Sequence, residues 1–165
     1  MGPAMKIAGE LTSIPSFDDL PEGTFTKEEK MLADFKKCLL MVAGAAVQKL
    51  MTTLAKEQEV LMNIADLAIS IYMAESSLLR VQKHLLSHSE EESAVRIAIV
   101  KTLFYDAADQ INKFGKDAIN SFAEGDERKM MLMGLKRFTK SNDINPKETR
   151  QIIAQRIIAD NKYNI

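Results

Sequence analysis

The sequence predicts an all-α protein: an antiparallel helical bundle of about four to five main helices, preceded by a short N-terminal helix and a linker. Apolar residues recur every three or four positions through most of the chain, which is the spacing of one face of a helix. No β-hairpin pattern is evident. At 165 residues, such a chain can bury roughly 70% of the surface exposed by its unfolded form. We assign residues 1–25 to a connection and linker and residues 26–165 to the bundle.

The N-terminal region carries weak helical signals. Residues 3–11 could form one short helix or the end of a longer one. Residues 12–25 contain Pro15, Pro21 and Gly23 without a helical period, so they predict the linker.

The next helix is expected from residue 27 to about residue 53. Thr26 and Glu29 have the spacing of a capping box, in which two side chains satisfy free backbone N–H groups at a helix start. Its apolar stripe is Met31, Phe35, Leu39, Val42, Ala46 and Leu50. Gly44–Ala46 have little side-chain bulk, so another helix could approach closely there.

The central helix, expected over residues 56–86, carries two apolar stripes. The first is Val60, Ile64, Leu67, Ile71, Leu78, Val81 and Leu85. The second is Leu61, Ala65, Ala68, Tyr72 and Leu79. A surface helix needs only one apolar face, so the pattern predicts that this helix lies inside the bundle.

A polar turn over residues 87–93 separates this helix from the next, expected over residues 93–123. The stripe of that helix is Ile97, Val100, Phe104, Ala108, Ile111, Gly115, Ala118 and Phe122. We expect Gly125 to end it.

Two shorter helices complete the bundle. Residues 126–138 have acids at the start and bases at the end, as the helix dipole favours. The last helix is predicted to begin with Asn145 as N-cap, Pro146 in the first turn and Glu148 as the capping acid. It carries Ile153, Ile157 and Ile158 and is expected to end near Asp160.

The histidines give a weak indication of a metal site. His84 and His88 share one helical face, but neither follows a carboxylate at the spacing of a di-iron bundle. Glu90 and Glu91 lie across the turn and leave a divalent metal possible. Because no nearby residue completes a tetrahedral set, we favour a solvated helix end.

Catalytic signatures are also missing. Ser76 and Ser77 have no histidine close in sequence, and Cys38 lies in an apolar run, where a thiol usually behaves as a small hydrophobe. The polar residues of the central helix are Asp66, Glu75 and Arg80. Asp66 could act as an acid–base group, but we interpret all three as interhelical hydrogen-bond partners. We therefore expect no catalytic, cofactor-binding or metal-binding residues in this chain.

Composition narrows the partners and the compartment. The 22 basic and 23 acidic residues argue against a nucleic-acid binder, which needs a concentrated basic surface. Cys38 is the single cysteine and suits a reducing compartment, and no signal peptide or apolar run of about twenty residues is visible. We expect a cytoplasmic protein. Met130, Met131 and Met133 could bind a partner helix, but we favour core packing for them. Residues 128–137 could also lie on a membrane surface, and a packed helix with charged ends explains them equally well.

The run KEQEVLMNIADLAISIYMAESSLLR, residues 56–80, resembles the C-terminal helical extension of very-long-chain-type acyl-CoA dehydrogenases. The matching positions are Glu57, Gln58, Leu61, Ile64, Ala65, Asp66, Ile69 and Tyr72. Residues 36–50 resemble the extension of bacterial members. The resemblance is good over residues 26–86, diffuse over residues 93–138 and weak beyond.

This resemblance implies a non-catalytic domain of an FAD-dependent enzyme that oxidises acyl-CoA to trans-2-enoyl-CoA in fatty acid β-oxidation. The flavin site, the glutamate base and the acyl-CoA cavity of the family match nothing in residues 1–165. The partners implied are the catalytic domains of the parent chain and further copies in a homo-oligomer, with membrane contact possible. The alternative is a free-standing helical adaptor that binds partner helices.

Overall fold

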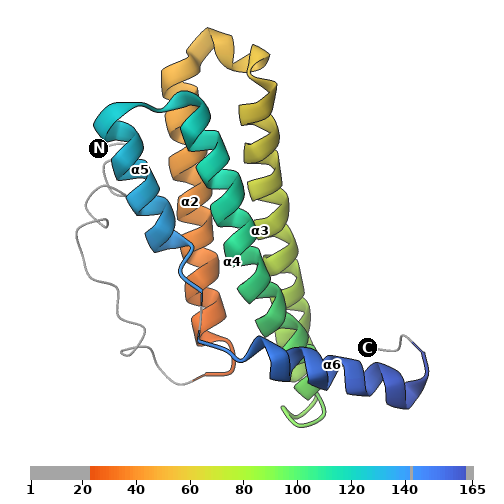
Figure 1. Cartoon of the computed structure of the whole chain (residues 1–165). Coiled ribbons are helices and arrows are strands. Elements are labelled where there is room, and N and C mark those ends of the chain that lie inside the picture. The colour runs from red at the N-terminus through yellow and green to blue at the C-terminus, as the bar shows by residue number, and fades with distance from the viewer. Residues whose placement is uncertain (1–22, 142, 163–165) are drawn as a thin grey trace.

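The computed structural model (Figure 1) describes residues 23–141 and 143–162. Its elements are α2 (Thr26–Leu50), the 3-10 segment η1 (Met51–Lys56), α3 (Gln58–Leu85), α4 (Ala94–Phe122), α5 (Gly125–Phe138) and α6 (Pro146–Asp160). No strand occurs in these ranges, so the prediction of an all-α bundle is confirmed. The expected helix over residues 3–11 and nearly all of the expected linker lie outside the described residues, and the domain boundary at residue 26 stays a prediction.

Three long helices, α2, α3 and α4, run side by side and alternate in direction (Figure 1). The shorter α5 packs against α2 and α4, and α6 lies across the end of the bundle against α4. No residue of α6 is fully buried; its side chains contact α4 through a Thr102–Thr149 hydrogen bond of 2.8 Å and an Arg150–Asp106 ion pair of 2.7 Å. The core therefore belongs to α2–α5.

The core consists of the stripes predicted for α2 and α4 and the first stripe predicted for α3. Phe35 and Phe104 are fully buried and their rings stack with centroids 6.1 Å apart, which joins α2 to α4. Leu67 of α3 is also fully buried. Gly115 allows α5 to approach α4, because a Cβ atom there would lie 2.5 Å from Cδ1 of Leu135.

The second stripe of α3 is not buried, so the prediction that this helix lies inside the bundle is wrong. The exposed fractions are 39% for Leu61, 71% for Tyr72 and 56% for Leu79, and Ala65 and Ala68 are also exposed. The reason is geometric: within the described residues α3 packs against α2 and α4 on one side, and no helix covers its other side.

Of the two predicted helix-start signals, the structure contains the one at Asn145 but not the one at Thr26. Oδ1 of Asn145 accepts the backbone N–H of Glu148 at 3.4 Å with Pro146 following the cap, as predicted. The capping box at Thr26 is wrong, because α2 begins one residue earlier with Phe25 as its N-cap and no side-chain cap. The carboxylate of Glu29 instead accepts from Nε2 of Gln82 on α3 at 2.6 Å.

Two helix ends also differ from expectation. The helix α2 ends at Leu50 rather than near residue 53, because Met51 adopts a positive φ of 43° and a 3-10 turn follows. Gly125 does not end α4, which stops at Phe122; it has a φ of 56° and starts α5 instead. That left-handed conformation suits glycine and redirects the chain between the two helices.

Candidate functional site

The two histidines form a stacked pair rather than a metal site. Their ring centroids lie 3.8 Å apart, and Nδ1 of His88 lies 3.1 Å from the carbonyl oxygen of His84. Across the turn, the guanidinium of Arg96 donates to Nε2 of His84 at 3.0 Å. Among the described residues, no group of three or more histidine, cysteine, aspartate or glutamate side chains could hold a metal.

The electrostatic environment of His84 disfavours its protonation. Desolvation lowers its pKa from 6.5, and electrostatic interactions with Arg96 and His88 lower it further, against the opposing effect of Glu92. Glu92 itself has a lowered pKa because its carboxylate accepts hydrogen bonds from the backbone N–H and hydroxyl of Ser89.

The remaining reactive candidates are structural. Burial raises the pKa of the Cys38 thiol to about 12, and the side chain is fully buried, so it has little nucleophilic character. Glu75 forms a 2.5 Å ion pair with Lys36 of α2, as expected of an interhelical partner. Asp66 is half-buried and Arg80 is exposed; neither forms an ion pair within the described residues, so the interhelical interpretation holds for Glu75 alone.

One feature that the fold does not explain is an exposed apolar surface, here called the α2–α3 face. Its members are Leu40, Gly44 and Val47 of α2, Met51 at the start of η1, and Leu61, Ala65, Ala68, Tyr72 and Leu79 of α3. All nine residues are exposed; Leu40 is 60%, Val47 55% and Met51 72% exposed.

The two stripes of this face lie next to each other. The Lys36–Glu75 and Glu29–Gln82 contacts fix α2 and α3 in an antiparallel register. In that register, successive steps of four, seven and four residues from Lys36 reach Leu40, Val47 and Met51. Steps of three or four residues back from Glu75 reach Tyr72, Ala68, Ala65 and Leu61, and one step of four residues forward reaches Leu79. The face therefore spans both helices, and the Lys36–Glu75 pair lies between Tyr72 and Leu79 along α3.

The composition of α2 reflects the same surface. Residues Thr26–Lys56 are long and apolar enough to cross a membrane by length and composition alone. Only 17% of their most apolar 18-residue stretch is buried. A core helix of a small bundle would bury a larger share, so much of the apolar character of α2 belongs to its outward side.

Residues 128–137 contribute less exposed apolar surface than their sequence suggests. Met131 is 7% exposed and packs in the core, whereas Met130 and Met133 are 61% and 71% exposed on the outer side of α5. Within Gly44–Ala46, Gly44 faces open space and Ala46 is buried.

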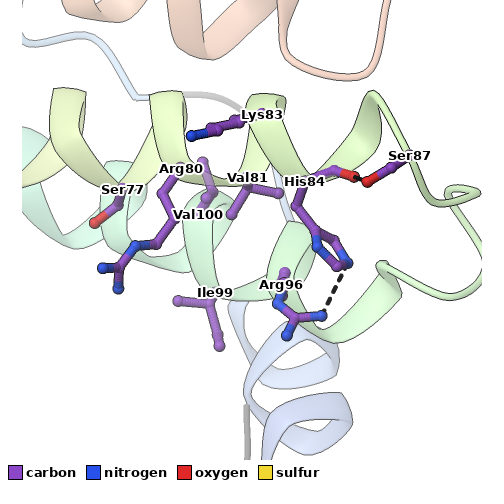
Figure 2. Close-up of a pocket in the computed structure, with 9 residues that line it drawn as sticks. All are labelled: Ser77, Arg80, Val81, Lys83, His84, Ser87, Arg96, Ile99 and Val100. Atoms are coloured by element: carbon purple, nitrogen blue, oxygen red, sulfur yellow. Dashed lines mark hydrogen bonds between the residues drawn. The ribbon is translucent and has the colours of Figure 1, made fainter.

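A second feature is a groove between the end of α3 and the start of α4, with a volume of about 670 Å³ (Figure 2). Arg80, Lys83, His84 and Arg96 line it, together with two serine hydroxyl groups, and no carboxylate of residues 23–141 and 143–162 does. Its apolar lining is limited to Val81, Ile99 and Val100. This groove is called the α3–α4 groove below.

Comparison with known proteins assigns the domain. The family model "Acyl-CoA dehydrogenase, C-terminal domain" matches residues 34–137. The chain belongs to this family. The match extends the resemblance well beyond residue 86, across the part where the sequence signal is diffuse.

Two relatives from bacilli are similar over nearly the whole chain. A probable acyl-CoA dehydrogenase of Bacillus subtilis (strain 168) is 29% identical over 143 residues, which cover 87% of this chain and 24% of the relative. The crystal structure of an acyl-CoA dehydrogenase complexed with FAD from Bacillus anthracis superposes with a TM-score of 0.88 and 29% identity, covering 98% of this chain and 27% of that one. The chain thus spans about a quarter of the length of these relatives and corresponds to a C-terminal acyl-CoA dehydrogenase domain.

Proposed function

We propose that this domain packs through the α2–α3 face onto the catalytic domains of an FAD-dependent acyl-CoA dehydrogenase, which converts acyl-CoA to trans-2-enoyl-CoA in fatty acid β-oxidation. The observation that carries the proposal is the exposure of nine apolar or small residues along two adjacent helices. Contiguous apolar patches of more than a few hundred Å² usually mark contact surfaces. About three quarters of each relative lies outside the region that this chain matches. That remaining part of the polypeptide is large enough to cover the α2–α3 face.

The described residues do not fit a flavin. The α3–α4 groove is open, and Val81, Ile99 and Val100 provide too little apolar wall to enclose a tricyclic ring. We therefore assign FAD binding and the oxidation itself to the catalytic domains. The domain described here contributes packing and quaternary structure.

The cellular setting follows from the same proposal. We place the enzyme in the cytoplasm as a homo-oligomer; the buried Cys38 is compatible with a reducing compartment. A free-standing adaptor would use the same face for a partner helix, and the experiment below separates the two.

The test is a chimera in which this chain replaces the C-terminal quarter of the Bacillus subtilis relative. With the native α2–α3 face, we expect the flavin-containing and helical parts to unfold in one cooperative transition. Val47→Glu and Tyr72→Glu place charges on the face, and they should separate the transitions while leaving helicity unchanged.

Met133→Glu is the matched control, because Met133 is as exposed as Tyr72 but lies on α5. It should leave the single transition intact. If the face variants behave like this control, or if the chimera with the native face already unfolds in two steps, the domain does not pack through α2 and α3.

A further inference from the structure

The α3–α4 groove is an uncompensated basic site. Arg80, Lys83 and Arg96 form no ion pair within the described residues. Elsewhere on the same molecule, cations such as Lys49 and Arg150 pair with carboxylates of a neighbouring helix at 2.7 Å. A chain with net charge −1 has enough acids to neutralise this groove, yet no acid in the part of the chain that the structure describes lines it.

Among the described residues, the acid that acts on His84 in the groove is already engaged. Glu92 influences His84, but its carboxylate is held by Ser89 in the turn, at 3.0 Å from the backbone nitrogen and 3.3 Å from the hydroxyl. Like charges brought close without a counter-charge destabilise a fold, so an external anion is the natural complement.

The geometry of the arginines suits an oxyanion. In Figure 2 the guanidinium groups of Arg80 and Arg96 extend to the same side of the helix pair, with Ile99 between them, while Lys83 points away at the rim. Arg96 is positioned by its 3.0 Å hydrogen bond to Nε2 of His84, which uses one of its donors and leaves the others free. Guanidinium groups bind phosphate oxygens in a bidentate manner, and the hydroxyl of Ser77 adds a short-range donor, whereas the hydroxyl of Ser87 already donates to the carbonyl oxygen of His84 at 3.3 Å.

We propose that the α3–α4 groove binds a phosphate-bearing ligand, with Arg80 and Arg96 as its phosphate-binding residues. Ile99, with the buried Val81 and Val100 beneath it, offers a small apolar floor for an organic group attached to the phosphate. The ligand is either a soluble phosphate compound or the headgroup of an anionic lipid, since both present the same oxyanion. This inference is independent of the packing proposed for the α2–α3 face, which lies on the other flank of α3.

The test uses the 165-residue chain with two probes at constant ionic strength. Inorganic pyrophosphate is titrated by calorimetry, and vesicles of phosphatidylcholine with or without phosphatidylglycerol are assayed by co-sedimentation. Arg80→Gln and Arg96→Gln should each weaken binding of the preferred probe roughly tenfold or more, because each removes a charge-assisted hydrogen-bond donor. Arg96→Lys keeps the charge but loses the planar fork, so its affinity should fall between the native chain and Arg96→Gln.

Arg128→Gln is the matched control, since Arg128 is an exposed arginine on α5, outside the groove. Arginine-dependent binding of pyrophosphate identifies a soluble ligand, and arginine-dependent binding of phosphatidylglycerol vesicles alone identifies a lipid headgroup; either result supports the site. The proposal is overturned if the native chain binds neither probe at millimolar concentration, or if Arg128→Gln weakens binding as much as the groove variants do. Circular dichroism of each variant shows whether the fold is retained.

Discussion

Leu67 and Leu79 lie on the same helix, and truncating each to alanine should have very different effects. Leu67 is fully buried in the core formed by α2, α3 and α4, while Leu79 is 56% exposed on the α2–α3 face. Leu67→Ala removes buried methyl and methylene groups and leaves a cavity, which costs about 2–5 kcal/mol in the free energy of unfolding. In a domain of this size that corresponds to a fall in melting temperature of roughly 5–20 °C.

The identical substitution at Leu79 should change the free energy of unfolding by about 0.5 kcal/mol or less. Thermal unfolding followed by circular dichroism at low micromolar concentration measures both, with the native chain as reference. The comparison cancels the helix propensities, because both changes replace leucine by alanine within α3. Equal losses at the two positions would mean that the second stripe is covered within the domain, and the α2–α3 face would then be no free surface.

Three further results are expected. Cys38 should react with a thiol reagent at pH 8 only as fast as the chain unfolds, because it is fully buried with a pKa of about 12; rapid labelling of the folded chain would contradict its placement. Gly44→Ala, in open helical space, should stabilise the chain by up to about 1 kcal/mol in a denaturant titration. Gly115→Ala should lack this gain, since its Cβ atom would lie 2.5 Å from a buried leucine methyl group. In an NMR titration, His84 should have a pKa below 6.5 that rises in Arg96→Gln. With this lowered pKa of His84, the native folded chain binds fewer protons than the unfolded chain. This histidine therefore makes the free energy of unfolding increase as pH rises from below the folded pKa toward 6.5.

The helices themselves were predictable because each long one carries a regular apolar stripe. The expected and observed ranges of α3 and α4 agree within two residues at each end. Local end signals were less informative. A capping box such as Thr26–Glu29 stabilises a helix start by only about 1 kcal/mol, and tertiary contacts of Glu29 with α3 compete with it.

The α3–α4 groove was not predicted, although part of its signal is present in the sequence. Arg80 and His84 are one turn apart on the same helical face. The polar turn over residues 87–93 reverses the chain, and a reversal centred near residue 90 places His84 opposite Arg96, as the 3.0 Å hydrogen bond confirms. Pairing across the turn therefore finds the site, whereas a search for metal ligands or nucleophiles within one helix does not.

The second stripe of α3 explains why sequence alone misjudged this helix. An apolar stripe indicates side chains that are buried in the complete protein. Burial of apolar surface is favourable whether the covering atoms belong to the same domain or to another domain. Periodicity therefore cannot separate a core face from an interface. The separation comes from the neighbours: within the described residues α3 packs against α2 and α4 on one side only. The same reasoning accounts for α2, which is apolar enough for a membrane span although only 17% of its most apolar 18-residue stretch is buried. If the proposed function is correct, the exposed apolar residues of α2 and of α3 have one cause, which is the contact that the catalytic domains make with the α2–α3 face.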